Sequence, residues 1–165
     1  DVIKLGADRI MFDALLNYSL DEIANSSIIL GSQALIGCVP LKTHLGKIYR
    51  FNYLTKKIEL LTKEFLEKIY SASISELLLV DYLNEGTNKA FDLKILQSTL
   101  IKEIEIPIIL FGGISTHKIA KQILTKENVA GVSIGNYLSY KENSIQTLKY
   151  NLDIPSIRKH NFHNV

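Results

Sequence analysis

Three apolar segments, each followed closely by glycine, dominate the second half of this sequence. They cover residues 77–81, 106–111 and 129–134. Uninterrupted apolar strands are typical of parallel sheets that are buried on both faces, and amphipathic segments of helical spacing lie between them. The pattern therefore predicts an α/β fold in which strands and helices alternate.

The glycine turns that follow these segments predict an anion-binding site. Gly112 and Gly113 follow one strand, and Gly135 with Asn136 follows the next. The carboxyl ends of parallel strands meet at one edge of the sheet, where glycine lets backbone N–H groups approach a phosphate closely. These residues are therefore candidates for phosphate binding, and a sugar-phosphate-like ligand is the predicted class.

Composition excludes several other kinds of partner. The chain has 165 residues and a net charge of +2 spread along the sequence, whereas nucleic-acid binding needs a basic stripe. No apolar run reaches the roughly 20 residues that cross a membrane, and no leader opens the sequence, so a cytoplasmic protein is expected. The single cysteine, Cys38, lies in an apolar run and is interpreted as a buried free thiol. His160 and His163 have no Cys or carboxylate beside them, so no metal site is predicted.

Further elements complete the predicted order. Strands are expected over 9–12 and 34–41, and residues 47–53 are expected to pair back across Leu45 and Gly46 as a small hairpin. Helices are expected over 20–26, 58–72, 93–104, 116–126 and 143–151. Ser115 and Asp92 are interpreted as helix caps. Such a series gives an open doubly wound sheet or a closed barrel of roughly 250 residues, of which this chain would supply about five units. Residues 1–152 are expected to form this partial barrel and residues 153–165 a polar tail.

Four motifs occur together in the order and spacing of one enzyme family. They are LGADR at 5–9, GSQA at 31–34, EGT at 85–87 with Asp92, and IPII at 106–109 with Gly112 and Gly113. With them the chain resembles the cyclase subunit of imidazole glycerol phosphate synthase, a (β/α)8 TIM barrel that works with a glutaminase. The resemblance runs from the family's fourth strand to its end. It implies that the chain supplies strands 4 to 8.

The resemblance also implies roles for individual residues. Glu85 stands where the family has a catalytic Asp, so it is the predicted general acid or base. Asp8, Arg9 and Glu76 match the entrance through which ammonia passes, and they are expected to form a charged gate next to the glutaminase. The implied partners are a glutaminase subunit, in a heterodimer, and a phosphate-bearing sugar or nucleotide-sugar substrate. No cofactor is implied.

Several residues depart from the family's pattern. Pro40 stands where an acidic residue is expected, and Asp13 replaces an Asn that supports a second phosphate. Val80 and Asp81 replace hydroxyl-bearing residues. These departures, and the segment 135–144, favour a paralogue that transfers ammonia in sugar amidation. Two alternatives stay open, which are the histidine-pathway cyclase itself and a non-catalytic scaffold that activates a glutaminase.

Overall fold

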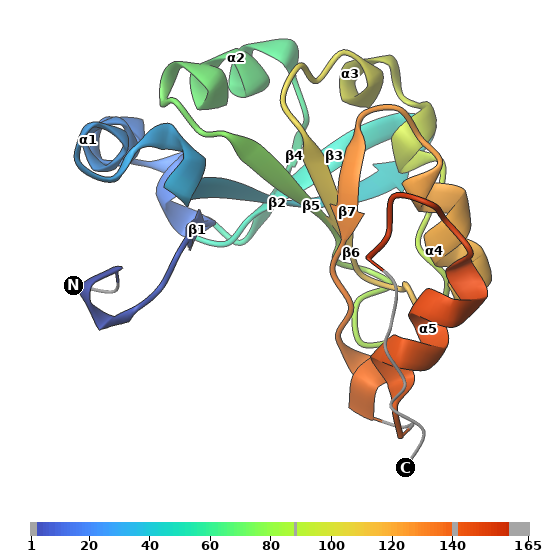
Figure 1. Ribbon diagram of the computed structural model, residues 1–165. Helices are drawn as coiled ribbons and strands as arrows, with labels where there is room; N and C mark the ends of the chain where they lie inside the picture. The colour runs from blue at the N-terminus through green and yellow to red at the C-terminus, as the bar shows by residue number, and fades with distance from the viewer. Residues whose placement is uncertain (1–2, 88, 140–141, 159–165) are drawn as a thin grey trace.

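A curved sheet of seven strands forms the centre of the molecule (Figure 1). The computed structural model describes residues 3–87, 89–139 and 142–158, without the side chain of Asn136. The strands are β1 (Ile10–Phe12), β2 (Leu35–His44), β3 (Lys47–Asn52), β4 (Lys57–Leu60), β5 (Glu76–Asp81), β6 (Ile108–Phe111) and β7 (Val129–Val132). Their order is β4-β3-β2-β5-β6-β7, with β1 pairing with β2.

Helices separate the strands that run parallel. The α-helices are α1 (Leu20–Leu30), α2 (Lys63–Ser71), α3 (Thr99–Lys102), α4 (His117–Leu124) and α5 (Ser144–Leu152). Short 3-10 helices cover Ile3–Leu5, Ala14–Asn17, Ser32–Ala34, Ile95–Gln97 and Asn136–Ser139. Within the described ranges, no helix has the length and apolar character that would let it cross a membrane.

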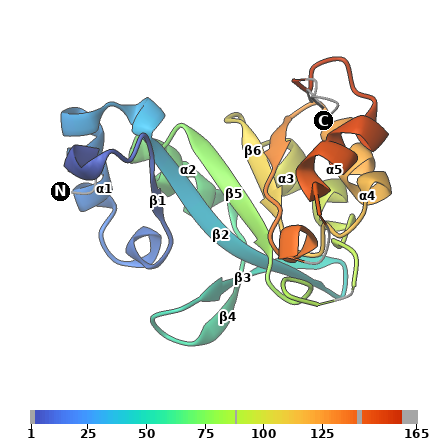
Figure 2. The same cartoon turned by 60° about the horizontal axis from the view of Figure 1, so that its bottom comes forward.

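The parallel strands and their helices form part of a (β/α)8 barrel, so the expected fold class is confirmed. β1, β2, β5, β6 and β7 pair in parallel, and the five α-helices follow the outer side of the sheet in Figure 1. Figure 2 shows the parallel strands side by side, with the β3–β4 hairpin projecting from the sheet. The opposite, inner face of the sheet carries no helix in the described part of the chain.

Each strand divides its side chains between these two faces because successive residues of a strand point in opposite directions. On β5, Leu77 and Leu79 are fully buried in the large core beneath the helices. Leu78 and Val80 belong instead to a smaller apolar cluster on the inner face. The sheet is therefore apolar on both sides, as the uninterrupted strand sequences predict.

The helix expected over residues 58–72 is wrong in its first part. Ile58 and Leu60 lie in β4, where Ile58 pairs with Phe51 and Leu60 with Tyr49 of β3. The helix α2 begins only after Thr62, whose hydroxyl accepts a hydrogen bond from the N–H of Phe65. Antiparallel pairing with β3 satisfies the backbone of this segment and overrides its helical spacing.

The helix expected over residues 93–104 is also wrong, because the segment is interrupted. Ser98 has an extended backbone (ψ 135°) and separates a 3-10 turn from the short helix α3. The predicted cap of α4 lies one residue too early, since Thr116 rather than Ser115 accepts the hydrogen bond from Ile119 N–H. The hairpin across Leu45 and Gly46 is confirmed.

Candidate functional site

A small pocket at the carboxyl ends of β5, β6 and β7 brings several of the predicted site residues together. Gly112, Gly113 and Gly135 line it, and so does Glu85 from the loop after β5. Ser115 and Ser133 contribute hydroxyl groups to the same pocket. The two glycine turns therefore lie at one rim. Asn136 follows Gly135, but its side chain lies outside the described residues.

Two of these glycines are required by the backbone. Gly112 has φ +98° and Gly113 has φ +67°, values that favour glycine. A Cβ on Gly112 would lie 2.5 Å from the carbonyl oxygen of Asp81, and one on Gly113 would lie 2.6 Å from the nitrogen of Phe91. The turn after β6 is consequently packed tightly against the loop that carries Glu85.

The pocket offers backbone donors to a ligand. Among the residues that the structure describes, none accepts a hydrogen bond from the N–H groups of Gly113 and Gly135. The pocket also adjoins the start of α4, where the helix dipole favours negative charge. Free N–H groups beside a helix amino terminus suit an anion such as phosphate.

The loop that carries Glu85 is fixed by a buried carboxylate. Asp81, at the end of β5, is 1% exposed, and its Oδ2 accepts hydrogen bonds from Asn84 Nδ2 (2.7 Å) and from the N–H of Asp92 (2.7 Å). The carbonyl of Asp81 accepts another from the N–H of Glu85 at 2.9 Å. Thr43 of β2 donates its hydroxyl to the carboxylate of Asp92. The loop is therefore tied to two strands.

At the opposite, amino end of the sheet, two of the predicted gate residues form an ion pair. Arg9 Nη1 lies 2.8 Å from Glu76 Oε2, and Arg9 Nη2 donates to Ser75 Oγ at 3.4 Å. Arg9 immediately precedes β1 and Glu76 begins β5, so the pair spans the first residues of β2. Asp8 is exposed and joins no ion pair that the described residues form.

An apolar surface lies between the ion pair and the glycine pocket. It consists of alternate side chains that face inward, Met11, Ile36, Cys38, Leu78, Val80, Ile109 and Phe111. On β7, Gly131 pairs with Ile109, and a Cβ on it would have no heavy atom within 4 Å. The inner face is therefore charged at its amino end, apolar in the middle and polar at its carboxyl end.

A second polar group of residues lies at the carboxyl end, next to β1. Burial raises the pKa of the Asp13 carboxyl, and burial together with the negative charge of Asp13 raises the pKa of Cys38 to about 12. Cys38 is therefore a protonated thiol at neutral pH and is no nucleophile. Burial, followed by the nearby charges of Asp13 and other acidic groups including Glu85, also raises the pKa of Tyr53.

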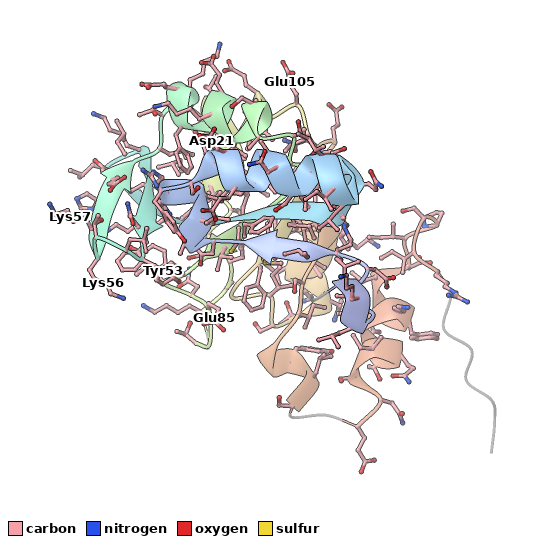
Figure 3. All side chains as sticks on the ribbon, turned by 90° about the vertical axis from the view of Figure 1, so that its left-hand side faces the viewer. Asp21, Tyr53, Lys56, Lys57, Glu85 and Glu105 are labelled. Atoms are coloured by element: carbon pink, nitrogen blue, oxygen red, sulfur yellow. The ribbon has the colours of Figure 1, made fainter. Side chains whose placement is uncertain are left out.

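Tyr53 and Asp81 were not among the residues that the sequence singles out for roles in the site. Tyr53 reaches it only because the β3–β4 hairpin folds back, and Figure 3 shows Tyr53 and Glu85 at the same edge of the molecule. Asp81 acts through the loop that it fixes, and the sequence marks it only as a strand-end residue that replaces a hydroxyl-bearing residue of the family. Pro40 is buried and pairs with Val80, so it adds no titratable group.

No cluster of three or more His, Cys, Asp or Glu side chains able to hold a metal ion occurs within residues 3–87, 89–139 and 142–158. His117 is the first residue of α4. His160 and His163 lie outside the described residues.

Comparisons with known proteins give the site its family context. Residues 1–144 match the family described as "Histidine biosynthesis protein". The chain is 26% identical over 150 residues to the imidazole glycerol phosphate synthase subunit HisF of Exiguobacterium, with 90% of this chain and 58% of that protein covered. It is 28% identical over 116 residues to the HisF subunit of Petrotoga mobilis, with 68% and 46% covered. It is 27% identical over 157 residues to that of Leuconostoc mesenteroides, with 92% and 60% covered.

The chain thus spans less than two thirds of the length of these curated relatives. The family match covers most of the chain and includes both the ion pair at the amino end and the glycine pocket. The chain therefore belongs to the histidine biosynthesis protein family.

Proposed function

We propose that the chain is part of the cyclase-like subunit of a glutamine amidotransferase, which adds ammonia from a partner glutaminase to a phosphate-bearing sugar. One observation carries this proposal. The pocket lined by Glu85 and the two glycine turns lies at the opposite end of the inner face from the Arg9–Glu76 pair. An apolar surface joins the two ends.

In this proposal the glycine pocket anchors the substrate. Backbone N–H groups of Gly113 and Gly135 donate to phosphate oxygens, and the tight turn at Gly112 keeps side chains out of the way. A fixed phosphate turns the encounter of ammonia and sugar into an intramolecular one, which removes much of the entropic barrier.

The ion pair and the apolar inner face would handle ammonia. Arg9 and Glu76 form the charged entrance on the side of the glutaminase, and Asp8 lies beside them as part of the partner interface. Neutral ammonia crosses an apolar surface more readily than an ion does, because ions lose more hydration energy. Shielding from water would also limit competing reactions of the sugar.

Glu85 is the proposed catalytic residue. When ammonia attacks a carbonyl carbon of the sugar, the C–N bond forms as the C=O π bond breaks and its electron pair moves to the oxygen. The nitrogen then loses a proton, which the Glu85 carboxylate accepts as a general base and passes on to that oxygen. Asp81 acts as a positioning residue, because it holds the turn from which Glu85 extends. No step of this scheme needs a cofactor.

We infer that sugar amidation is the use of this chemistry, because the carboxyl end holds one phosphate pocket and a carboxylate at Asp13. The histidine-pathway cyclase is a second candidate, and the names of the relatives favour it. The third candidate is a scaffold that only activates a glutaminase. Pro40 favours it, because the family has an acidic residue at this position.

Nitrogen transfer is the experiment that tests the proposal. The full-length protein is co-purified with its glutaminase and given amide-labelled [15N]glutamine with a panel of sugar phosphates and nucleotide sugars. We expect the label in one sugar product. Glu85→Gln lowers this transfer by about 100-fold, whereas the control Glu22→Gln, on the exposed surface of α1, leaves it unchanged.

The outcomes separate the three candidates. Label in the product of the histidine-pathway substrate alone would assign the chain to that pathway. If both variants hydrolyse glutamine at equal rates and no product carries the label, only the scaffold hypothesis remains.

A further inference from the structure

A second polar site lies across the sheet from the glycine pocket, and we call it the Asp13 site (Asp13, Cys38 and Tyr53). Phe12 pairs with Gly37, so Asp13, the next residue, lies level with Cys38 on the neighbouring strand. Two strands, β2 and β5, separate β1 from β6. At about 4.8 Å per strand, the Asp13 site and the glycine pocket are roughly 10–15 Å apart at the same end of the sheet.

The Asp13 carboxylate has an unused hydrogen-bonding atom. Its Oδ1 is buried and has no hydrogen-bond partner among the described residues, and Asp13 gives no side-chain cap to the 3-10 helix that follows it. A buried acceptor without a donor destabilises a folded protein. Such an atom is stabilised when a ligand supplies the donor.

The charge of Asp13 is also uncompensated. The ion pairs within the described ranges join Arg9 to Glu76, Arg50 to Glu59 and, on α2, Lys63 to Glu67 and Lys68 to Glu64. Asp13 therefore forms no ion pair with a described Lys, Arg or His. The charge of Asp13 acts on Cys38 and Tyr53, and Glu85 acts on Tyr53 as well. A phosphate entering this site would meet like charge.

We propose that Asp13 is a specificity-determining residue, which accepts hydrogen bonds from hydroxyl groups at the uncharged end of the substrate and excludes substrates with a phosphate at both ends. The inference rests on the proposed function, since the glycine pocket must hold the first phosphate. The inference adds which chemical groups the substrate carries at the end that lies in the Asp13 site. Tyr53, which directly follows β3 in the β3–β4 hairpin, would offer its phenol to the same hydroxyl groups.

Binding measurements on the full-length protein test this inference. The probes are trehalose 6-phosphate, a disaccharide with one terminal phosphate, and trehalose 6,6′-bisphosphate, which has one at each end. By calorimetry we expect the wild type to bind the monophosphate at least about tenfold more tightly. Asp13→Asn keeps the size of the side chain and removes its charge, so it should reduce this preference to about twofold.

A second variant tests the inference independently of Asp13→Asn. Tyr53 is partly exposed, and Tyr53→Lys places a cation beside Asp13, so the preference should shift towards the bisphosphate. A preference that is unchanged in these variants would overturn the inference.

The variant Gly113→Ala distinguishes failure of the inference from failure of the proposed function. It should weaken both probes alike, because the added Cβ would clash with the backbone of residues 89–91 and displace the turn that lines the shared phosphate pocket. If Gly113→Ala leaves binding of the monophosphate intact, or if the wild type binds neither probe, the proposed phosphate anchor is wrong. If Gly113→Ala removes binding while Asp13→Asn keeps the preference, only the role of Asp13 is wrong.

Discussion

At the scale of single residues, the turn at Gly113 combines a left-handed backbone with a close approach of another loop. Its φ is +67°, and an added Cβ would lie 2.7 Å from the carbonyl oxygen of Lys89. Gly46 is a matched control, since its φ is +73° and its Cβ would meet nothing within 4 Å. We expect Gly46→Ala to cost about 1 kcal/mol and Gly113→Ala about 3 kcal/mol. Urea unfolding measures both, and equal costs would contradict the packing at Gly113.

Asp81 supports a second prediction at this scale. Asp81→Ala leaves the N–H of Asp92 and the side-chain amide of Asn84 without their buried acceptor. Loss of charge-assisted hydrogen bonds predicts a destabilisation of about 2–4 kcal/mol. Hydrogen exchange should show a loss of protection at the Asp92 amide before other amides. Unchanged protection there would mean that Asp81 does not fix the loop.

Asp13 predicts a pH dependence of stability. Because burial raises its pKa above 3.8, the folded state binds the Asp13 proton more tightly than the unfolded state does. The protonated carboxyl therefore stabilises the folded state below the pKa that Asp13 has in the unfolded chain. This contribution is lost as the pH rises through the pKa that Asp13 has in the folded protein. Asp13→Asn should therefore raise the urea midpoint at pH 7, and the gain should shrink towards pH 4. A variant that is less stable than wild type at pH 7 would contradict the prediction.

The sequence predicts the glycine turns of the site, since Gly112 and Gly113 have a local conformational reason to be glycine. The family resemblance also places Arg9 and Glu76 at strand starts, where their side chains form an ion pair, while the gate role of Asp8, Arg9 and Glu76 stays a prediction. Tyr53 and the anchoring role of Asp81 could not be predicted. They depend on how a hairpin and a loop fold back against the sheet, and no local pattern encodes that approach.

At the scale of secondary-structure elements, the first turn of α4 shows which of two neighbouring residues, Ser115 or Thr116, caps the helix. Thr116 accepts a hydrogen bond from Ile119 N–H at 3.3 Å, whereas Ser115 makes no such bond. Thr116→Ala should lower the free energy of unfolding by about 1 kcal/mol, and Ser115→Ala should change it little. Thermal or urea unfolding of the two variants tests this, and the reverse order would restore Ser115 as the cap.

The predicted elements failed where tertiary pairing competes with local pattern. Residues 58–72 have helical apolar spacing, yet β4 forms because its backbone pairs with β3 and because Glu59 can bond Arg50. Arg50 also lies 3.9 Å from the ring centre of Phe65 on α2, which binds the hairpin to the helix layer. By contrast, β5 and β6 carry apolar side chains on both faces, and their uninterrupted apolar sequences were sufficient to predict them.

At the scale of the whole molecule, open sheet edges predict self-association of this 165-residue chain when it is expressed alone. In the described part, β1 pairs only with β2, and β7 only with β6. Unpaired edges favour association, and Ile28 and Ile29 on α1 are 84% and 80% exposed. Lysines at both positions should weaken association about tenfold in sedimentation velocity, whereas Leu54→Lys on the hairpin should have little effect. Concentration-independent monomers would contradict the prediction.

The ion pair between Arg9 and Glu76 has a kinetic consequence for the amino end of the sheet. The two side chains keep 35% and 23% of their surface exposed, so they can separate by rotamer changes while the strands stay fixed. Exposed side chains rotate within picoseconds to nanoseconds, far faster than enzyme turnover. Dissolved salt screens exposed charges, so ionic strength should set how long this end stays open.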